Sequence, residues 1–208
     1  MKYQRLYYYF EKALSPFLCD EIIAQGFVNN PDIAYIGGKG IPRNDKEHKN
    51  LLEKRNSNTS WITAWWIKKE IDPYIRRANQ MAGWNFNITD SEAYQFTKYD
   101  EGQFYDWHTD AFETPHRDGP WQGLIRKISI TVSLSDPRDY EGGLLEFAYP
   151  QHEPDKCDYV KAREAMPRGS IIVFPSYTWH RVTPVTRGTR LSLVPVSYTH
   201  LRAHETRR

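Results

Sequence analysis

The stretch that decides the fold is "KISITVSL", residues 127–134, in which charged or polar side chains alternate strictly with apolar ones. Successive side chains of a β-strand point to opposite faces, so this alternation predicts a strand with one face in a core and one polar face. The residues expected on the core face are Ile128, Ile130, Val132 and Leu134.

Similar short runs lie on both sides of this stretch. They are "YQFTKY" (94–99), "LLEFA" (144–148), "IIVF" (171–174) and "RLSLV" (190–194). Turn-forming residues such as Gly142, Gly143 and Gly188 separate them. Many short strands joined by glycine- and proline-containing turns predict a sandwich or barrel.

Two helices are expected before the strands. Residues 15–26, "SPFLCDEIIAQG", supply an N-cap serine, a proline at the first helical position and a terminal glycine. A second apolar face at helical spacing predicts a helix that begins at Thr59 or Ser60, is kinked or interrupted at Pro73 and ends by Gly83. We expect both helices to pack against the strands.

Residues 29–58 are polar and charged, and predict an exposed excursion with little regular structure. Within them, the mixed-charge run "RNDKEHKNLLEKR" (43–55) is interpreted as a solvated loop. Cys19 and Cys157 make no disulfide framework.

The composition limits the function classes. A chain of 208 residues with 39% hydrophobic residues is expected to form one soluble globular domain. No apolar run approaches a membrane span and the first residues lack a secretory signal, so we expect a cytoplasmic protein. The net charge of +2 comes from residues 195–208, which carry three arginines and one glutamate, and the rest of the chain is neutral overall. A nucleic-acid partner is therefore not expected.

Ionisable groups gather in "YDEGQFYDWHTDAF", residues 99–112. On a strand, His108 and Asp110 would point to the same side, and His180 at the end of a later strand is the candidate for a third member. Two histidines and one carboxylate on one face of a metal ion leave positions open, as in non-haem iron(II) oxygenases. These three residues are the expected metal-binding and catalytic residues.

Arg190 and Ser192 share parity on the last predicted strand and would face the interior together. A guanidinium directed inward needs an anionic partner, and its planar fork binds a carboxylate with two hydrogen bonds. We therefore expect a carboxylate ligand at Arg190.

These patterns together resemble the iron(II)- and 2-oxoglutarate-dependent dioxygenases of the prolyl 4-hydroxylase-like, PKHD-type group. The matching segments are the series from Tyr99 to Asp110, "GGLLEF", "PRGSIIVFPS" and "HRVTPVTRGTRL", with "LSPFLCDEII" and "KRNSNTSWI" before them. The resemblance runs from about Leu14 to Val194. The spacing of a His-x-Asp pair, a distant histidine and an arginine ten residues further is its most specific part.

The resemblance implies an α+β, mainly β fold: a double-stranded β-helix (jelly-roll, cupin-like) barrel with N-terminal packing helices. It implies Fe(II) at His108, Asp110 and His180, 2-oxoglutarate at Arg190, and hydrogen bonds to 2-oxoglutarate from Tyr99 and Ser192. O2 would be the second cosubstrate and ascorbate the reductant.

The reaction implied is hydroxylation of an unactivated C–H bond, in a prolyl or other amino-acid residue, with release of succinate and CO2. The substrate would be a peptide, a protein or a small amino-acid-like molecule. Residues 1–194 would form the single dioxygenase domain, and residues 195–208 a disordered or non-native tail. Oligomeric state and substrate identity stay open.

Two other functions are weighed. An oxygenase of alkylated nucleic-acid bases would carry a second arginine six residues after the first, where this chain has Val196. A non-enzymatic metal- or ligand-binding barrel module would not need Arg190 beside Ser192.

Five more residues invite a functional interpretation. Residues 111–127 could form a lid over the substrate. Within them, we interpret His116 as exposed and Trp121 as a packing residue. Arg126 is either a substrate contact or a solvated charge at a strand edge, and we favour the solvated charge. His200 stands four residues before His204, but we interpret the pair as part of the tail rather than a second metal site.

Overall fold

The computed structural model describes residues 5–35, 42, 44–111, 114–117, 119–149 and 158–200. Its helices are α1 (Pro16–Val28), α2 (Asp45–Lys54) and α3 (Trp65–Met81). Its first eight strands are β1 (Tyr8–Phe10), β2 (Asp32–Ile33), β3 (Arg55–Asn56), β4 (Asn58–Ile62), β5 (Asp90–Ser91), β6 (Tyr94–Tyr99), β7 (Phe104–His108) and β8 (Leu124–Ser133). The remaining strands are β9 (Tyr140–Gly142), β10 (Leu145–Tyr149), β11 (Asp158–Lys161), β12 (Ile171–Pro175), β13 (His180–Val182), β14 (Val185–Gly188), β15 (Arg190–Val194) and β16 (Val196–His200).

The strands form two main sheets. The larger follows the order β1-β12-β8-β15-β6-β4-β2, with β16 and β5 attached beside β8. The smaller follows the order β11-β10-β13-β7-β3, and β14 pairs with β9 separately. This two-sheet, mainly β architecture agrees with the predicted fold class. The pairings among the described strands leave both sheets open, so the expected closed barrel is not found there.

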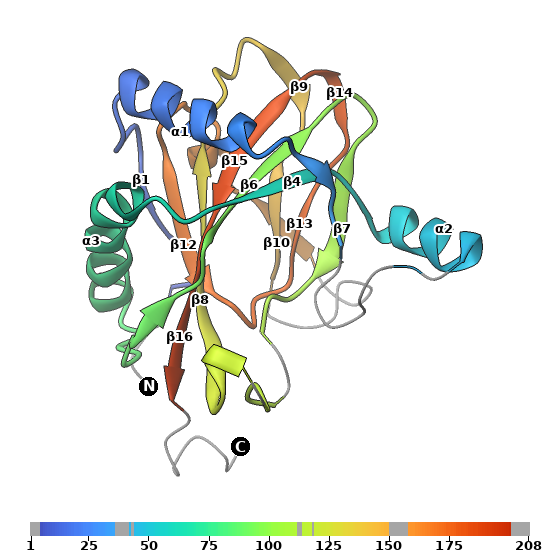
Figure 1. Ribbon diagram of the computed structural model, residues 1–208. Helices are drawn as coiled ribbons and strands as arrows, with labels where there is room; N and C mark the ends of the chain where they lie inside the picture. The colour runs from blue at the N-terminus through green and yellow to red at the C-terminus, as the bar shows by residue number, and fades with distance from the viewer. Residues whose placement is uncertain are drawn as a thin grey trace.

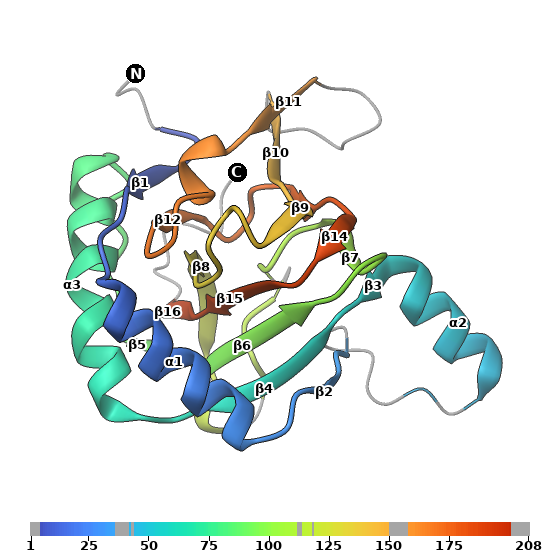
Figure 2. The same ribbon diagram turned by 90° about the horizontal axis from the view of Figure 1, so that it is seen from above.

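The helices α1 and α3 cover the outer face of the larger sheet, whereas α2 projects from the opposite side of the molecule (Figures 1 and 2). The main hydrophobic core lies between the sheet and these two helices. The predicted core face of β8 and the residue after it is confirmed, because Ile128, Ile130, Val132 and Leu134 are fully buried in that core.

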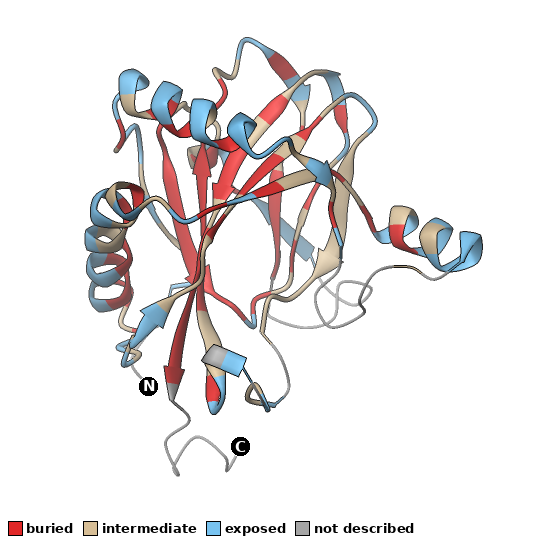
Figure 3. Ribbon diagram, viewed as in Figure 1, coloured by how far each residue is buried: buried red, intermediate tan, exposed pale blue. Residues whose placement is uncertain are grey.

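The polar face of β8 is also buried, as the burial colouring in Figure 3 shows for this strand. Ser129, Thr131 and Ser133 point away from the helices, toward the smaller sheet, and Thr131 lines a cavity there. The alternation predicted the two faces correctly, and the second face borders a polar interior rather than solvent.

The predicted start of the first helix is confirmed. Ser15 is its N-cap, with its hydroxyl accepting a hydrogen bond from the Leu18 N–H at 3.2 Å. The helix continues past Gly26 to Val28. The second helix, α3, is not interrupted at Pro73, because it runs as one helix from Trp65 to Met81. It begins later than predicted because residues 58–62 pair with β6 as strand β4.

The prediction that residues 29–58 have little regular structure is wrong for most of those that the structure describes. These residues contain β2, α2 and β3, and α2 is capped by Asn44, whose side chain accepts from the Glu47 N–H at 2.9 Å. The mixed-charge run is therefore mainly a surface helix, in which Leu51 is the buried side chain.

The prediction of a disordered tail at residues 195–208 is wrong for residues 196–200. Residues 196–200 form β16, which pairs antiparallel with β8 and β5, so these residues are ordered rather than disordered. Residues 201–208, including His204, lie outside the described residues, as does Cys157. Cys19 is buried and free. None of the described helices is long and apolar enough to cross a membrane.

Candidate metal centre

A cavity of about 160 Å³ lies between the two sheets. The smaller sheet contributes His108 and His180 to its wall, and the larger sheet contributes Tyr99, Arg190 and Ser192. Asp110 also lines the cavity. The fold therefore brings all six site residues expected from the sequence into one cavity.

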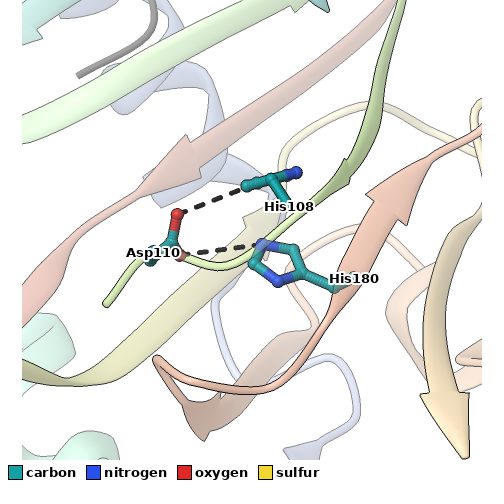
Figure 4. Close-up of side chains that lie close together, drawn as sticks. All are labelled: His108, Asp110 and His180. Carbon is teal, nitrogen blue, oxygen red and sulfur yellow. Dashed lines mark ion pairs between the residues drawn. The ribbon is translucent and has the colours of Figure 1, made fainter. Parts of the chain in front are cut away.

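The two histidines and the aspartate converge at a single point (Figure 4). One ligand atom from each of the three side chains lies within 4.8 Å of the others. The Nε2 atom of His108 is 3.8 Å from Asp110 Oδ1, and that of His180 is 3.6 Å from Asp110 Oδ2. β7 and β13 pair so that the two histidines are direct cross-strand partners.

Asp110 lies just beyond the end of β7, and its backbone N–H donates to the Ser176 carbonyl at 2.9 Å. The Ala111 N–H donates to the same carbonyl at 2.9 Å, and the two bonds hold the bend at Asp110, where the carboxylate faces both histidines. The two-residue spacing predicted this proximity, although the strand itself ends at His108.

Backbone carbonyls hold both imidazoles in the tautomer that a metal requires. Nδ1 of His108 lies 2.7 Å from the Asp106 carbonyl oxygen, and Nδ1 of His180 lies 2.9 Å from that of Thr178. A carbonyl oxygen only accepts, so each Nδ1 carries a hydrogen, and in a neutral imidazole with that hydrogen the lone pair lies on Nε2, the atom that faces Asp110. Burial and the neighbouring His180 ring hold the pKa of His108 well below its ordinary value, so this imidazole is neutral.

The third group is a buried carboxylate. Burial by itself raises the pKa of Asp110, but the two imidazoles, the Ser129 hydroxyl and Arg126 outweigh it and hold the pKa below its ordinary value. Its Oδ2 atom is buried and accepts no hydrogen bond from the described residues. Two imidazole Nε2 atoms and an unsatisfied carboxylate oxygen fit a divalent transition metal with open coordination positions.

Arg190 extends from β15 into the same cavity and is only 3% exposed. It donates to the Ser192 hydroxyl at 3.2 Å, and its guanidinium carbon lies 5.5 Å from the centre of the Tyr99 ring. Tyr99 is the direct cross-strand partner of Arg190. Among the described residues no carboxylate lies within ion-pair distance of Arg190, so the cation is available to an anionic ligand.

The interpretation of Arg126 as a solvated charge at a strand edge is wrong. The Arg126 guanidinium lines the cavity, contacts the Glu92 carboxylate at 2.5 Å and lies 3.4 Å from the Asp110 carbonyl oxygen. His116 is half-buried rather than exposed, and Trp121 packs as expected, stacked on Tyr198 at 4.6 Å between ring centres. The lid interpretation of residues 111–127 cannot be followed at 112, 113 and 118, which lie outside the described residues.

Sequence reasoning missed two residues beside the metal centre. The Tyr105 ring stacks on the His108 ring at 3.5 Å between centres. Arg55 of β3 lies directly across from Tyr105 of β7, and its guanidinium carbon is 4.5 Å from the centre of the Tyr105 ring. Tyr105 could have been found from the sequence, because it lies three residues before the predicted ligand His108. The burial of Arg55 could not, because the residues before it are charged.

Comparison with known sequences gives a family and a set of relatives. Residues 94–195 match the model of the 2OG-Fe(II) oxygenase superfamily. A PKHD-type hydroxylase of Sphingopyxis alaskensis is 41% identical over 95 residues, which are 46% of this chain and 38% of that protein. The PKHD-type hydroxylase YbiX of Escherichia coli (strain K12 / DH10B) is 32% identical over 99 residues, 47% of this chain and 39% of that protein. The chain thus spans about two fifths of the length of these relatives.

Solved structures show the same fold at lower identity. A Trichoplax adhaerens prolyl hydroxylase bound to a hypoxia inducible factor peptide fragment superposes with a TM-score of 0.67 at 18% identity, covering 93% of this chain and 83% of that one. A Pseudomonas putida prolyl-4-hydroxylase gives 0.62 at 20% identity, covering 95% and 94%. These likenesses confirm the predicted jelly-roll class of fold.

Proposed function

From the membership of this chain, through residues 94–195, in the 2OG-Fe(II) oxygenase superfamily, we propose that it is an Fe(II)- and 2-oxoglutarate-dependent dioxygenase. The observation that carries the proposal is the convergence of two lone-pair imidazole nitrogens and the unsatisfied Asp110 oxygen in a cavity that also holds Arg190. The substrate we propose is a prolyl or other amino-acid unit, by analogy with the names of the relatives and neighbours.

Three residues have the role of metal ligands in this proposal. His108, Asp110 and His180 would hold Fe(II), leaving one face open to ligands. When bound, Fe(II) with 2-oxoglutarate and O2 supplies an oxidant strong enough to hydroxylate a C–H bond, while 2-oxoglutarate leaves as succinate and CO2. Asp110 is the one anionic ligand, so the centre stays cationic toward a dicarboxylate.

Arg190 orients the cosubstrate in this proposal. Its guanidinium is already fixed by Ser192 and by the Tyr99 ring, so little side-chain freedom is lost when it takes a carboxylate. The buried Tyr99 and Ser192 hydroxyls are proposed to donate to the same molecule. Phe174, Leu145 and Val182 complete an apolar wall near the metal ligands that excludes water from the reacting bond.

A binding measurement without oxygen tests the first step. Fe(II)-loaded protein should develop a visible absorption band when 2-oxoglutarate is added anaerobically, because the dicarboxylate chelates the iron. His108→Ala should show no band, and His48→Ala, which removes a histidine on the distant helix α2, should behave like the wild type. Iron loading without any spectral response to 2-oxoglutarate would favour the binding-module alternative.

Turnover tests the reaction itself. With Fe(II), O2 and ascorbate as the proposed reductant, the protein should form succinate from 2-oxoglutarate, and His108→Ala should form none. Arg190→Ala should raise the 2-oxoglutarate concentration needed by about tenfold or more, because it loses a charge-assisted hydrogen-bonded pair. Arg187→Ala, which removes an exposed arginine on β14, is the matched control.

The proposal also includes the partners and location that we expect from the sequence: an amino-acid-like or peptide substrate and a cytoplasmic setting. Repair of alkylated nucleic acid is the second oxygenase reaction to test in the same assay. Succinate formation stimulated by methylated oligonucleotides, and by no proline-containing compound, would replace the proposed substrate class.

A further inference from the structure

The cavity contains a second buried arginine that neither the metal nor 2-oxoglutarate requires. Arg55 is 6% exposed, although it ends a strongly charged stretch of the sequence. It sits on β3, at the edge of the smaller sheet, directly across from Tyr105 of β7. Its side chain lines the cavity that contains the metal-site residues.

Among the described residues, every hydrogen-bond partner of the Arg55 guanidinium is neutral. Nε donates to the Ser57 hydroxyl at 3.1 Å, Nη1 to the Tyr35 carbonyl at 3.2 Å, and Nη2 to the Gln95 side-chain oxygen at 2.8 Å. Three of the five N–H groups are thereby used, so two remain for a ligand. No ion pair to Arg55 is formed by the described part of the chain, and a buried cation without an anion is costly unless a ligand supplies the charge.

The charges in the cavity identify what is missing. Arg126 is neutralised by Glu92. In the loaded site, the charges of Fe(II), Asp110, Arg190 and dianionic 2-oxoglutarate cancel, which leaves Arg55 as the one unneutralised charge among the described residues that line the cavity. The group that would complete this balance is a single negative charge.

The position of Arg55 suits a substrate rather than the cosubstrate. The Tyr105 ring contacts both the Arg55 guanidinium and the His108 imidazole, so Arg55 is one aromatic ring away from the metal centre. Tyr35, which accepts from Arg55, lines the same cavity and is 42% exposed, so this side opens to solvent. A small molecule entering there could place its carboxylate on Arg55 and a C–H bond near the metal.

We propose that Arg55 binds the carboxylate of the substrate, so that the substrate class is a free amino acid or the C-terminal residue of a peptide. An internal prolyl residue has no carboxylate to offer and would leave the cation unpaired. This inference rests on the proposed oxygenase function for the identity of the neighbouring site, but the binding it describes is measurable without turnover.

The test compares ligands that differ in one charge. The 208-residue chain is loaded with redox-inactive Zn(II) and 2-oxoglutarate, and binding of the twenty free amino acids and of their twenty C-terminal amides is measured by calorimetry. At least one acid should bind about tenfold or more tightly than its own amide, because a charge-assisted hydrogen bond to Arg55 is lost in the amide. Failure of every acid to outbind its amide overturns the proposal.

Two substitutions assign that preference to Arg55. Arg55→Gln should abolish the preference for the acid and leave the affinity for 2-oxoglutarate unchanged, while Arg187→Gln should change neither. Gln95→Glu places a carboxylate at hydrogen-bond distance from Arg55 with no change in shape, so it should also abolish the preference and raise the melting temperature. It serves as the deciding variant if Arg55→Gln does not fold.

The outcomes separate this inference from the proposed function. Weaker 2-oxoglutarate binding in Arg55→Gln would place Arg55 in the cosubstrate site and overturn the inference. An acid preference that survives Gln95→Glu would do the same. Anaerobic chelation of iron by 2-oxoglutarate without any acid preference leaves the oxygenase proposal standing and this one refuted. An acid preference without chelation refutes the oxygenase proposal alone.

Discussion

The cavity wall depends on the absence of a side chain at one position. Gly143 precedes β10, has a φ of +57°, and a Cβ added to it would lie 2.8 Å from the Arg190 Cδ atom. An L side chain is disfavoured at this φ, and here it would also displace the arginine that faces the metal centre. A glycine in a turn thereby helps to set the position of a guanidinium in the interior.

Gly143→Ala is therefore expected to weaken 2-oxoglutarate binding several-fold and to lower the free energy of unfolding by about 1–2 kcal/mol. Calorimetric titration with 2-oxoglutarate and urea unfolding measure the two effects. Gly102→Ala is the matched control, because Gly102 has a φ of +80° but open space around the position of a Cβ. It should lose stability alone. Equal 2-oxoglutarate affinity in both variants would show that Gly143 does not position Arg190.

The site residues that the sequence revealed are those whose relation is local. His108 and Asp110 are two residues apart, and so are Arg190 and Ser192, so strand geometry alone places each pair on one side. His180 was the expected third member because it lies at the end of a later predicted strand, and the family resemblance assigned it the same role. Arg55 and Arg126 were misread because their partners are distant: Gln95 lies 40 residues from Arg55, and Glu92 lies 34 residues from Arg126. Spacing in the sequence carries no signal of such contacts.

At the scale of elements, period-two alternation was decisive for the strands. β6, β8, β10, β12 and β15 all match predicted runs, because each has at least one face in a continuous core. β4 was included in the predicted second helix because it is only five residues long and leads directly toward an amphipathic helix. α2 was missed because most of its side chains are polar, and local capping with a single buried leucine supports it.

Helix α1 packs on the larger sheet through a contact that only glycine permits. A Cβ at Gly26 would lie 2.3–2.6 Å from ring atoms of Phe96 on β6. In an exposed helix, replacing glycine by alanine is worth up to about 1 kcal/mol of added stability, but here the methyl group overpacks the interface. Gly26→Ala should therefore lower the free energy of unfolding in urea by about 1–3 kcal/mol.

The control is a double-mutant cycle. Phe96→Leu removes the ring that the new methyl group would meet, so the cost of Gly26→Ala should shrink in that background. An unchanged cost would mean that the loss arises elsewhere in α1.

The start of the same helix offers a smaller and independent effect. Ser15 accepts the Leu18 N–H, and an alanine there leaves that donor to water. Ser15→Ala should cost about 1 kcal/mol in the free energy of unfolding, measured in urea, whereas Ser15→Asp should cost little because its carboxylate can accept the same bond. Similar losses in both variants would argue against the cap as the cause.

At the scale of the whole molecule, the two sheets and the helices over them bury hydroxyl groups of tyrosines as well as apolar side chains. Burial, with the nearby Glu164, raises the pKa of Tyr7 to about 12. Burial, with Asp72, also raises the pKa of Tyr94. Both phenols lie against carboxylates contributed by other elements, Tyr7 bonding to Glu164 near β12 and Tyr94 to Asp72 of α3, so their protons are retained by the assembled fold rather than by local sequence.

This assembly predicts a loss of stability in alkali. The folded pKa of each group lies above its unfolded value of about 10, so its contribution is fully present below pH 10, where both states are protonated. Above pH 10 the unfolded chain ionises while the folded chain does not, and the contribution of Tyr7 declines through its folded pKa of about 12. The melting temperature should accordingly be flat between pH 8 and 9.5 and fall from pH 10 upward. In Tyr7→Phe the fall should be shallower, because one of these protons no longer differs between the two states, whereas Tyr159→Phe removes a tyrosine that is 49% exposed and touches neither group, and should reproduce the wild-type profile. A melting temperature that falls equally in all three proteins would mean that groups other than the buried tyrosines set the alkaline limit of the fold.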